Sequence, residues 1–153
     1  MKRCLLLCIT FALGGCFFSS PPSDEQMVHS FNTHKVVFEQ LVAMACHDGY
    51  AVVSMDPEWS KPENIPNAKK QRYYKLFRTI GVTQLQSYAG CRAQLSVWSV
   101  GLGGSGDYKD YQYRPENVEN QVASLDHLKL GDKIEFFYRK IAPDWYIHYA
   151  HWP

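Results

Sequence analysis

The spacing of the apolar residues changes at Gly81, and this change limits the possible folds more than any other feature of the sequence. Before Gly81, residues 24–47 and 67–80 carry apolar side chains at the three- and four-residue intervals of an amphipathic helix. After it, apolar and polar residues alternate, as they do in strands with one buried face. Helices followed by strands predict an α+β domain, with two helices packed on one face of an antiparallel sheet of about five to six strands.

Local signals agree with this division. Ser23 and Gln26 form the S-x-x-Q pattern of a capping box before the first helix, and Gly49 and Gly81 stand where a left-handed residue commonly ends a helix. Helices on one face leave the other face of the sheet uncovered, so we look for a binding site there. The expected strands are residues 50–55, 82–89, 92–100, 107–114, 133–141 and 145–152.

The start of the chain differs in character from the rest. Lys2 and Arg3 precede an apolar run, residues 4–13, that is too short to cross the hydrocarbon core of a bilayer as a helix. The run leads into the order Leu13-Gly14-Gly15-Cys16. This order resembles the lipobox of bacterial lipoproteins, in which Leu stands three residues before the Cys and small residues lie between them.

The resemblance implies both a domain organisation and a location. Residues 1–15 would be a lipoprotein signal peptide, residues 16–23 the lipidated Cys16 and a spacer, and residues 24–153 a single domain attached to the membrane through the lipid. Phe17, rather than Asp, follows the cysteine, which under the sorting rule of enterobacterial lipoproteins favours the outer membrane of the cell envelope. The alternative is an ordinary secretory peptide, cut at another small residue, with an inert Cys16.

Two cysteines, Cys46 and Cys91, remain outside the leader and the lipobox. An even pair in an exported domain predicts a disulfide. A loop of roughly 46 residues closed by this bond would stabilise the fold by about 4 kcal/mol. The alternative is a thiol-dependent or hydrolytic enzyme centred on Cys46 and His47, but neighbours on a helix point about 100° apart, so adjacency alone builds no catalytic pair.

Aromatic residues in the later strands are the candidate ligand-binding residues. Alternation places Trp145 and Tyr149 on one face of one strand, and Tyr111 and Tyr113 on one face of another. Exposed rings with polar tips suit a sugar or a protein partner, whereas the alternative is that the rings build the core. The glycine-rich run 101–106 lacks the Lys-Ser/Thr of a phosphate-binding loop, so we interpret it as a hairpin loop. Two of its residues, Gly103 and Gly104, are counted with the binding site.

The rest of the sequence narrows the function by exclusion. A formal net charge of +1 gives no basic excess for a nucleic-acid partner. No Cys or His spacing predicts a metal site, no motif predicts a cofactor, and no nucleophile stands with a base in a catalytic pattern. We therefore expect a non-enzymatic envelope lipoprotein that binds a protein or a cell-wall ligand, such as an inhibitor or immunity-type protein. A scaffold or assembly lipoprotein of an envelope machine is the alternative.

Overall fold

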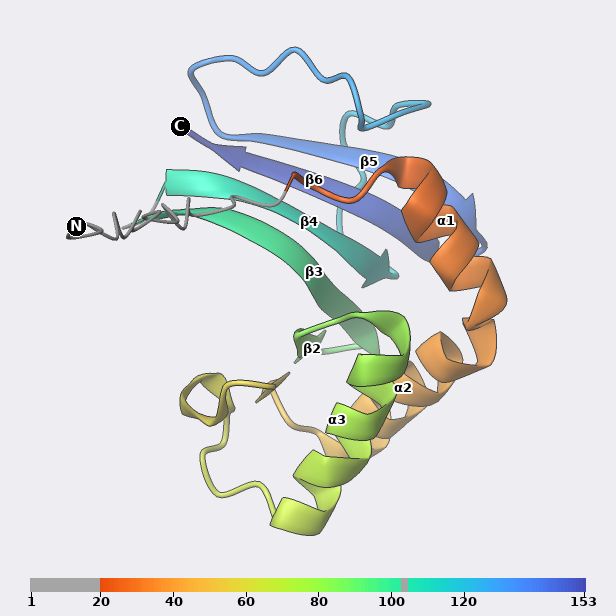
Figure 1. Ribbon diagram of the computed structural model, residues 1–153, viewed down its shortest axis with the longest axis vertical. Helices are drawn as coiled ribbons and strands as arrows, with labels where there is room; N and C mark the ends of the chain where they lie inside the picture. The colour runs from red at the N-terminus through yellow and green to blue at the C-terminus, as the bar shows by residue number, and fades with distance from the viewer. Residues whose placement is uncertain (1–19, 103–104) are drawn as a thin grey trace, which may run out of the picture.

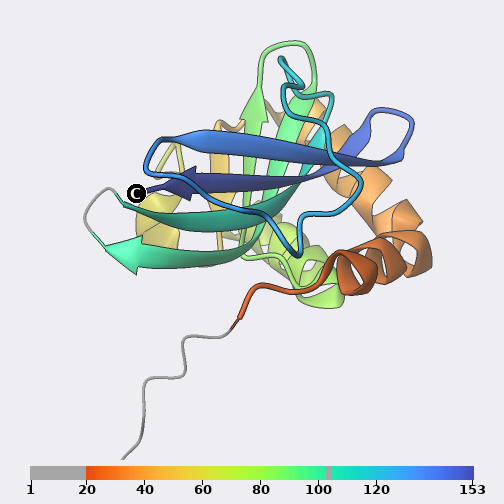
Figure 2. The same ribbon diagram turned by 90° about the horizontal axis from the view of Figure 1, so that it is seen from above.

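The computed structural model describes residues 20–102 and 105–153, which form one sheet with helices on one side of it (Figures 1 and 2). The leader, Cys16, Gly103 and Gly104 lie outside the described residues. The α-helices are α1 (Asp24–Thr33), α2 (Lys35–Asp48) and α3 (Asn67–Ile80), and a short 3₁₀ helix covers Pro57–Trp59. The strands are β1 (Val52–Ser54), β2 (Gln84–Tyr88), β3 (Arg92–Leu102), β4 (Ser105–Tyr113), β5 (Glu135–Ala142) and β6 (Trp145–Trp152).

The predicted α+β fold with an antiparallel sheet is confirmed, but the first expected helix is divided into two. His34 leaves the helical conformation with φ −116° and ψ 22° and separates α1 from α2. Its N–H donates to the Ser30 carbonyl at 3.0 Å, and its carbonyl accepts from Phe38 at 3.2 Å, so the break leaves these groups bonded. The bend turns the helical segment around the curved sheet and brings the rings of Phe31 and Phe38 to 5.2 Å (Figure 1).

The helix ends follow the signals in the sequence. The Ser23 hydroxyl accepts from the Gln26 N–H at 3.2 Å, and the Gln26 side chain accepts from the Ser23 N–H at 2.8 Å, which completes the predicted capping box. Gly49 (φ 68°) ends α2 and Gly81 (φ 70°) ends α3 in the left-handed conformation that glycine adopts at little cost.

The sheet has the strand order β1-β2-β3-β4-β6-β5, with every neighbouring pair antiparallel. Since β4 lies beside β6, the connection over residues 114–134 passes around the outer strand β5 (Figure 2). Along that edge Val122 donates to the Tyr138 carbonyl at 2.8 Å. At the opposite edge of the sheet, Val52 of β1 forms a bridge with Lys61.

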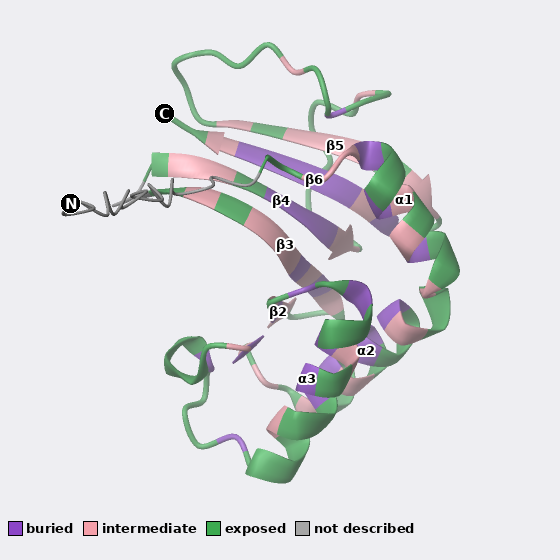
Figure 3. Ribbon diagram, viewed as in Figure 1, coloured by how far each residue is buried: buried purple, intermediate pink, exposed green. Residues whose placement is uncertain are grey.

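The core lies between the helices and the sheet, where large aromatic rings meet (Figure 3). Phe38 of α2 lies 4.7 Å from Tyr111 of β4 and 5.6 Å from Trp145 of β6, measured between ring centroids. A disulfide joins Cys46 in α2 to Cys91 in the β2–β3 turn, with their Cα atoms 5.2 Å apart. None of the helices that the structure describes combines the length and the apolar character that a membrane span requires.

A buried group of charges fixes the start of α1 to the sheet. Lys109 Nζ of β4 lies 2.9 Å from a carboxylate oxygen of both Asp24 and Asp126. Asp24 also contacts Arg139 at 3.0 Å and accepts the N–H of Leu125 at 2.7 Å, while Asp126 accepts the N–H of Asp24 at 2.9 Å. These contacts satisfy polar groups at the helix start and hold α1, β4, β5 and the 114–134 connection together.

Candidate functional site

The aromatic residues expected on an uncovered face lie on the side of the sheet that the helices cover. Trp145, Tyr111 and Tyr149 are only 3%, 1% and 7% exposed, so the expectation that they form an open surface is wrong. Tyr113 is half-buried, packs against Trp145 at 5.1 Å and, at the end of β4, also borders the pocket on the other face that is described next. The physical reason is that the apolar sides of α1 and α2 need large partners, and this face of β4 and β6 supplies them.

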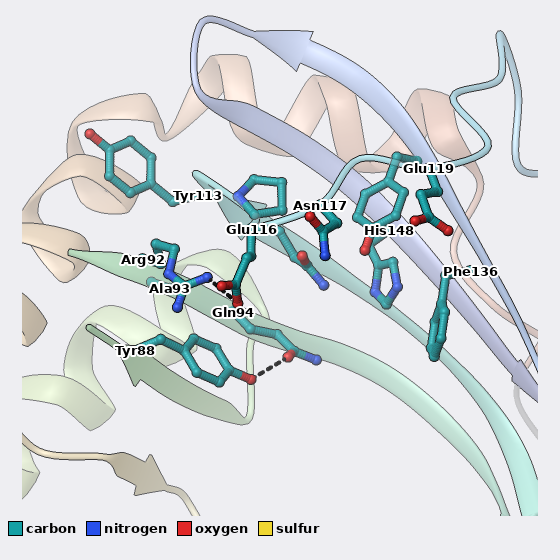
Figure 4. A pocket seen from close by; sticks show the side chains of 13 residues that line it. Tyr88, Arg92, Ala93, Gln94, Tyr113, Glu116, Asn117, Glu119, Phe136 and His148 are labelled. Atoms are coloured by element: carbon teal, nitrogen blue, oxygen red, sulfur yellow. Dashed lines mark hydrogen bonds and ion pairs between the residues drawn. The ribbon is translucent and has the colours of Figure 1, made fainter. Parts of the chain in front are cut away.

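None of the helices in the described part of the chain lies against the other face of the sheet, which carries a pocket of about 460 Å³ (Figure 4). Strands β2 to β6 form its floor, and the start of the 114–134 connection forms one wall. It is lined by thirteen residues: Tyr88, Arg92, Ala93, Gln94, Gln112, Tyr113, Pro115, Glu116, Asn117, Glu119, Phe136, Tyr138 and His148.

A pair of buried polar side chains lies at the floor of this pocket. Asp110 and His148 are direct partners across β4 and β6 and are 1% and 5% exposed. His148 Nδ1 lies 3.1 Å from the Asp110 carboxylate, which also accepts the amide N–H of Gln94 at 2.8 Å; the Tyr88 hydroxyl donates to Gln94 at 3.0 Å. Because the Asp110 carboxylate accepts in this network, the contact places a hydrogen on Nδ1 of His148.

The other imidazole nitrogen has no such partner. His148 Nε2 is buried and makes no hydrogen bond to any of residues 20–102 and 105–153. Two aromatic rings of β5 flank the imidazole, with Phe136 at 5.9 Å and Tyr138 at 4.8 Å between centroids. Nε2 accepts in the neutral imidazole and donates in the imidazolium, and in either form leaving it buried and unbonded costs about 1–3 kcal/mol. A ligand group that both donates and accepts, such as a hydroxyl, would recover that cost.

The rim of the pocket carries charge of both signs. Arg92 forms an ion pair with Glu116 at 2.6 Å and lies over the ring of Tyr88. Burial, followed by the charge of Asp110, raises the pKa of Tyr88, and burial with the charges of Asp110 and Glu119 raises the pKa of Tyr138. Both phenols therefore keep their hydrogens at neutral pH and can donate as well as accept.

The chemistry of this lining favours binding. Its thirteen described residues include no Ser, Thr, Cys or Lys that could act as a nucleophile, while amides, phenols and rings are abundant. Within residues 20–102 and 105–153 no three His, Cys, Asp or Glu side chains are grouped as a metal site would require.

The alternative centre at Cys46 is arranged differently from a catalytic pair. Its sulfur is bonded to Cys91 and is therefore no thiolate nucleophile. His47 has a largely exposed side chain whose Nδ1 lies 3.2 Å from Asp48.

The site that the structure brings together was missed by reasoning from the sequence. Alternation along β6 does separate His148 from Trp145, and that was the available signal. The contact of His148 with Asp110, however, depends on β4 and β6 being neighbours, which no local pattern reveals. Comparisons of this chain with protein-family models, with curated proteins and with solved structures give no match.

Proposed function

We propose that the protein is a lipid-anchored component of the bacterial cell envelope that binds a saccharide of the cell wall, without catalysis, in the pocket on the open face of the sheet. The observation that carries this proposal is the buried, unbonded Nε2 of His148 between the rings of Phe136 and Tyr138. Sugar hydroxyls are hydrogen-bond donors, and the apolar faces of sugar rings pack on aromatic rings.

The remaining lining fits the same class of ligand. Gln94, Gln112 and Asn117 offer amide groups that both donate and accept, and Tyr88 and Tyr138 add phenols. Such a mixture of flat rings and amides can follow the alternating apolar faces and polar edges of a saccharide.

The proposed location draws on the other end of the chain. The Leu13-Gly14-Gly15-Cys16 order supports lipid attachment at Cys16, and Phe17 favours the outer membrane under the sorting rule named above. The disulfide between Cys46 and Cys91 is what an oxidising compartment such as the periplasm permits. A domain attached to the outer membrane on its periplasmic side would lie next to the cell wall.

Sedimentation with purified peptidoglycan sacculi tests the proposal. The mature protein is expected to pellet with the sacculi, and Phe136→Ala and His148→Phe are expected to weaken binding about tenfold, a change of about 1.4 kcal/mol. His148→Phe keeps a flat ring but removes the Nε2 atom, while thermal melting verifies that each variant folds. The matched control is Trp59→Ala, which removes an exposed aromatic ring outside the pocket. Equal binding by all variants would contradict the proposal.

A protein partner is the second candidate, and the exposed rings of the open face favour it. Tyr88, Tyr108, Phe136 and Trp152 are each more than a third exposed, and aromatic residues dominate protein-binding surfaces. Cross-linking in intact cells distinguishes the cases. Recovery of one soluble enzyme supports an inhibitor or immunity-type protein, recovery of machine subunits supports a scaffold, and recovery of wall fragments supports the saccharide.

A further inference from the structure

We propose that the end of the sheet carrying Leu130, Ile134 and Trp152 rests in the headgroup region of the membrane that holds the lipid anchor. These three residues are called the apolar rim below. The inference rests on the proposed acylation of Cys16 and goes beyond ligand binding, since it assigns a second surface and a second partner, a phospholipid bilayer.

The first step is the point at which the chain leaves the domain. Lys109 Nζ donates to the Pro22 carbonyl at 2.8 Å and so fixes the chain just before α1. Ser20 and Pro21 border a hollow that Leu128 and Leu130 also line. The N-terminal end of the described chain is therefore held beside the 127–130 part of the connection.

The second step is the reach of the spacer. Only three residues, 17–19, separate Cys16 from Ser20. Four consecutive Cα–Cα steps of a fully extended chain span at most about 14 Å. A cysteine whose acyl chains are in the bilayer therefore keeps Ser20 within about 14 Å of the headgroups.

The third step is what that surface presents. Leu130, Ile134 and Trp152 are 37%, 52% and 37% exposed. Ile134 directly precedes Glu135, which pairs with His151, so Ile134 lies at the same end of the sheet as Trp152. Single exposed apolar residues are ordinary on protein surfaces, but Leu130 lines the hollow that Ser20 borders, and the neighbouring Gly131 is hydrogen-bonded to Glu135 and His151 at the strand ends that carry Ile134 and Trp152. Trp is also a preferred residue at the membrane–water interface.

The apolar rim is held in shape by hydrogen bonds. His151 Nε2 lies 3.1 Å from the Gly131 carbonyl, and the Gly131 N–H donates to the Glu135 carboxylate at 2.9 Å. The segment carrying Leu130 is thereby tied to the ends of β5 and β6. Lys129 and Lys133 are exposed in the same segment and can keep their ammonium groups in water above apolar side chains.

This placement also sets the direction of the pocket. The apolar rim lies where β6 ends and β5 begins. The pocket residues Arg92 and Glu116 lie at the opposite end of these strands, beside the end of β4. A domain seated on its rim would turn that end of the pocket away from the bilayer, toward the cell wall.

Fluorescence quenching tests the seating. The lipidated protein is reconstituted into phosphatidylcholine vesicles in which half of the lipids carry brominated acyl chains, and its tryptophan emission is compared with that in unbrominated vesicles. Trp152→Phe is expected to reduce the fractional quenching at least twofold, and so is the double change Leu130→Ser with Ile134→Ser. Val36→Ser removes an apolar side chain that is 75% exposed on α2 and should leave the quenching unchanged.

The mass of the N-terminal peptide separates the possible failures. One failure concerns the seating alone: Cys16 is acylated and the protein stays with the vesicles, but Trp152→Phe is quenched as strongly as the wild type, or neither protein is quenched. This result would overturn the seating of the apolar rim and leave the lipid anchor supported. If Cys16 carries no lipid, the proposed anchoring and the seating fall together. If quenching depends on the apolar rim but the protein does not bind sacculi, only the proposed saccharide ligand is overturned.

Discussion

Lys109 Nζ lies 2.9 Å from the carboxylate of Asp24, and these two side chains are 1% and 0% exposed. Arg139 and Asp126 complete the group, so each buried charge has an opposite charge beside it. Removing one partner of such a pair leaves the other buried and uncompensated, which costs about 3–5 kcal/mol.

Lys109→Met is therefore expected to lower the free energy of unfolding by about 3–5 kcal/mol, because Asp24 and Asp126 lose the cation that they share and only Arg139 remains beside Asp24. Urea denaturation of the disulfide-intact protein measures this change. Lys61→Met serves as the control, since the Lys61–Glu63 pair is exposed and such pairs contribute about 0–1 kcal/mol. Similar losses in both variants would mean that the buried group contributes no more than a surface pair.

Acid should weaken the fold through the same carboxylate. Burial on its own raises the pKa of Asp24, but hydrogen bonds from Leu125 and Lys109, with the charge of Lys109, bring that pKa below its ordinary value. A lowered folded-state pKa stabilises the fold above the unfolded value of about 3.9, and this contribution is lost as the pH falls through the folded value.

The expected result is a steeper fall in the free energy of unfolding below about pH 4 for the wild type than for Asp24→Asn, measured by urea denaturation at a series of pH values. Glu63→Gln, which changes an exposed carboxylate, should keep the wild-type slope. A wild-type slope in Asp24→Asn would show that other groups control the acid sensitivity.

The disulfide should contribute substantially to stability. Cys46 and Cys91 are 45 residues apart, and closing a loop of that length stabilises by about 4 kcal/mol on the chain-entropy model. The double change Cys46→Ala with Cys91→Ala is expected to lose about that amount in urea denaturation. Thiol titration of the unreduced mature protein should find neither thiol free. Two reactive thiols would instead revive the enzyme centred on Cys46 and His47.

Trp145→Ala should damage the core rather than a binding surface. Its ring lies 5.2 Å from Phe31 and 5.6 Å from Phe38, and replacing a buried ring of this size by Ala costs about 3–5 kcal/mol. Trp59→Ala, on the exposed 3₁₀ helix, should stay within about 0.5 kcal/mol of the wild type. If thermal melting showed equally small losses for both, Trp145 would not be part of the core.

Patterns that act over a few residues were read correctly from the sequence. The alternation of β6 gave its bounds, Trp145–Trp152, and Ser23, Gln26, Gly49 and Gly81 gave the helix ends. The break at His34 was not predictable in this way, because the apolar spacing continues across it from Phe31 to Phe38.

The candidate site required knowledge of which strands are neighbours. Periodicity separates Trp145 from His148 but does not say which of the two faces the helices. That choice follows from the packing of Phe38 against Trp145. The pairing of Asp110 with His148 needs β5 to lie outside β6, and the 114–134 connection carries no local signal of its path.

The bridges along the two outer strands have a consequence for contacts between copies of the protein. Unpaired strand edges invite neighbouring molecules to add their own strands, which leads to aggregation. Here Gln121 bridges to Tyr138 along β5, and Lys61 bridges to Val52 along β1. The chain itself therefore occupies part of both outer edges of the sheet, which leaves fewer free backbone groups to which a strand of a second molecule could be added.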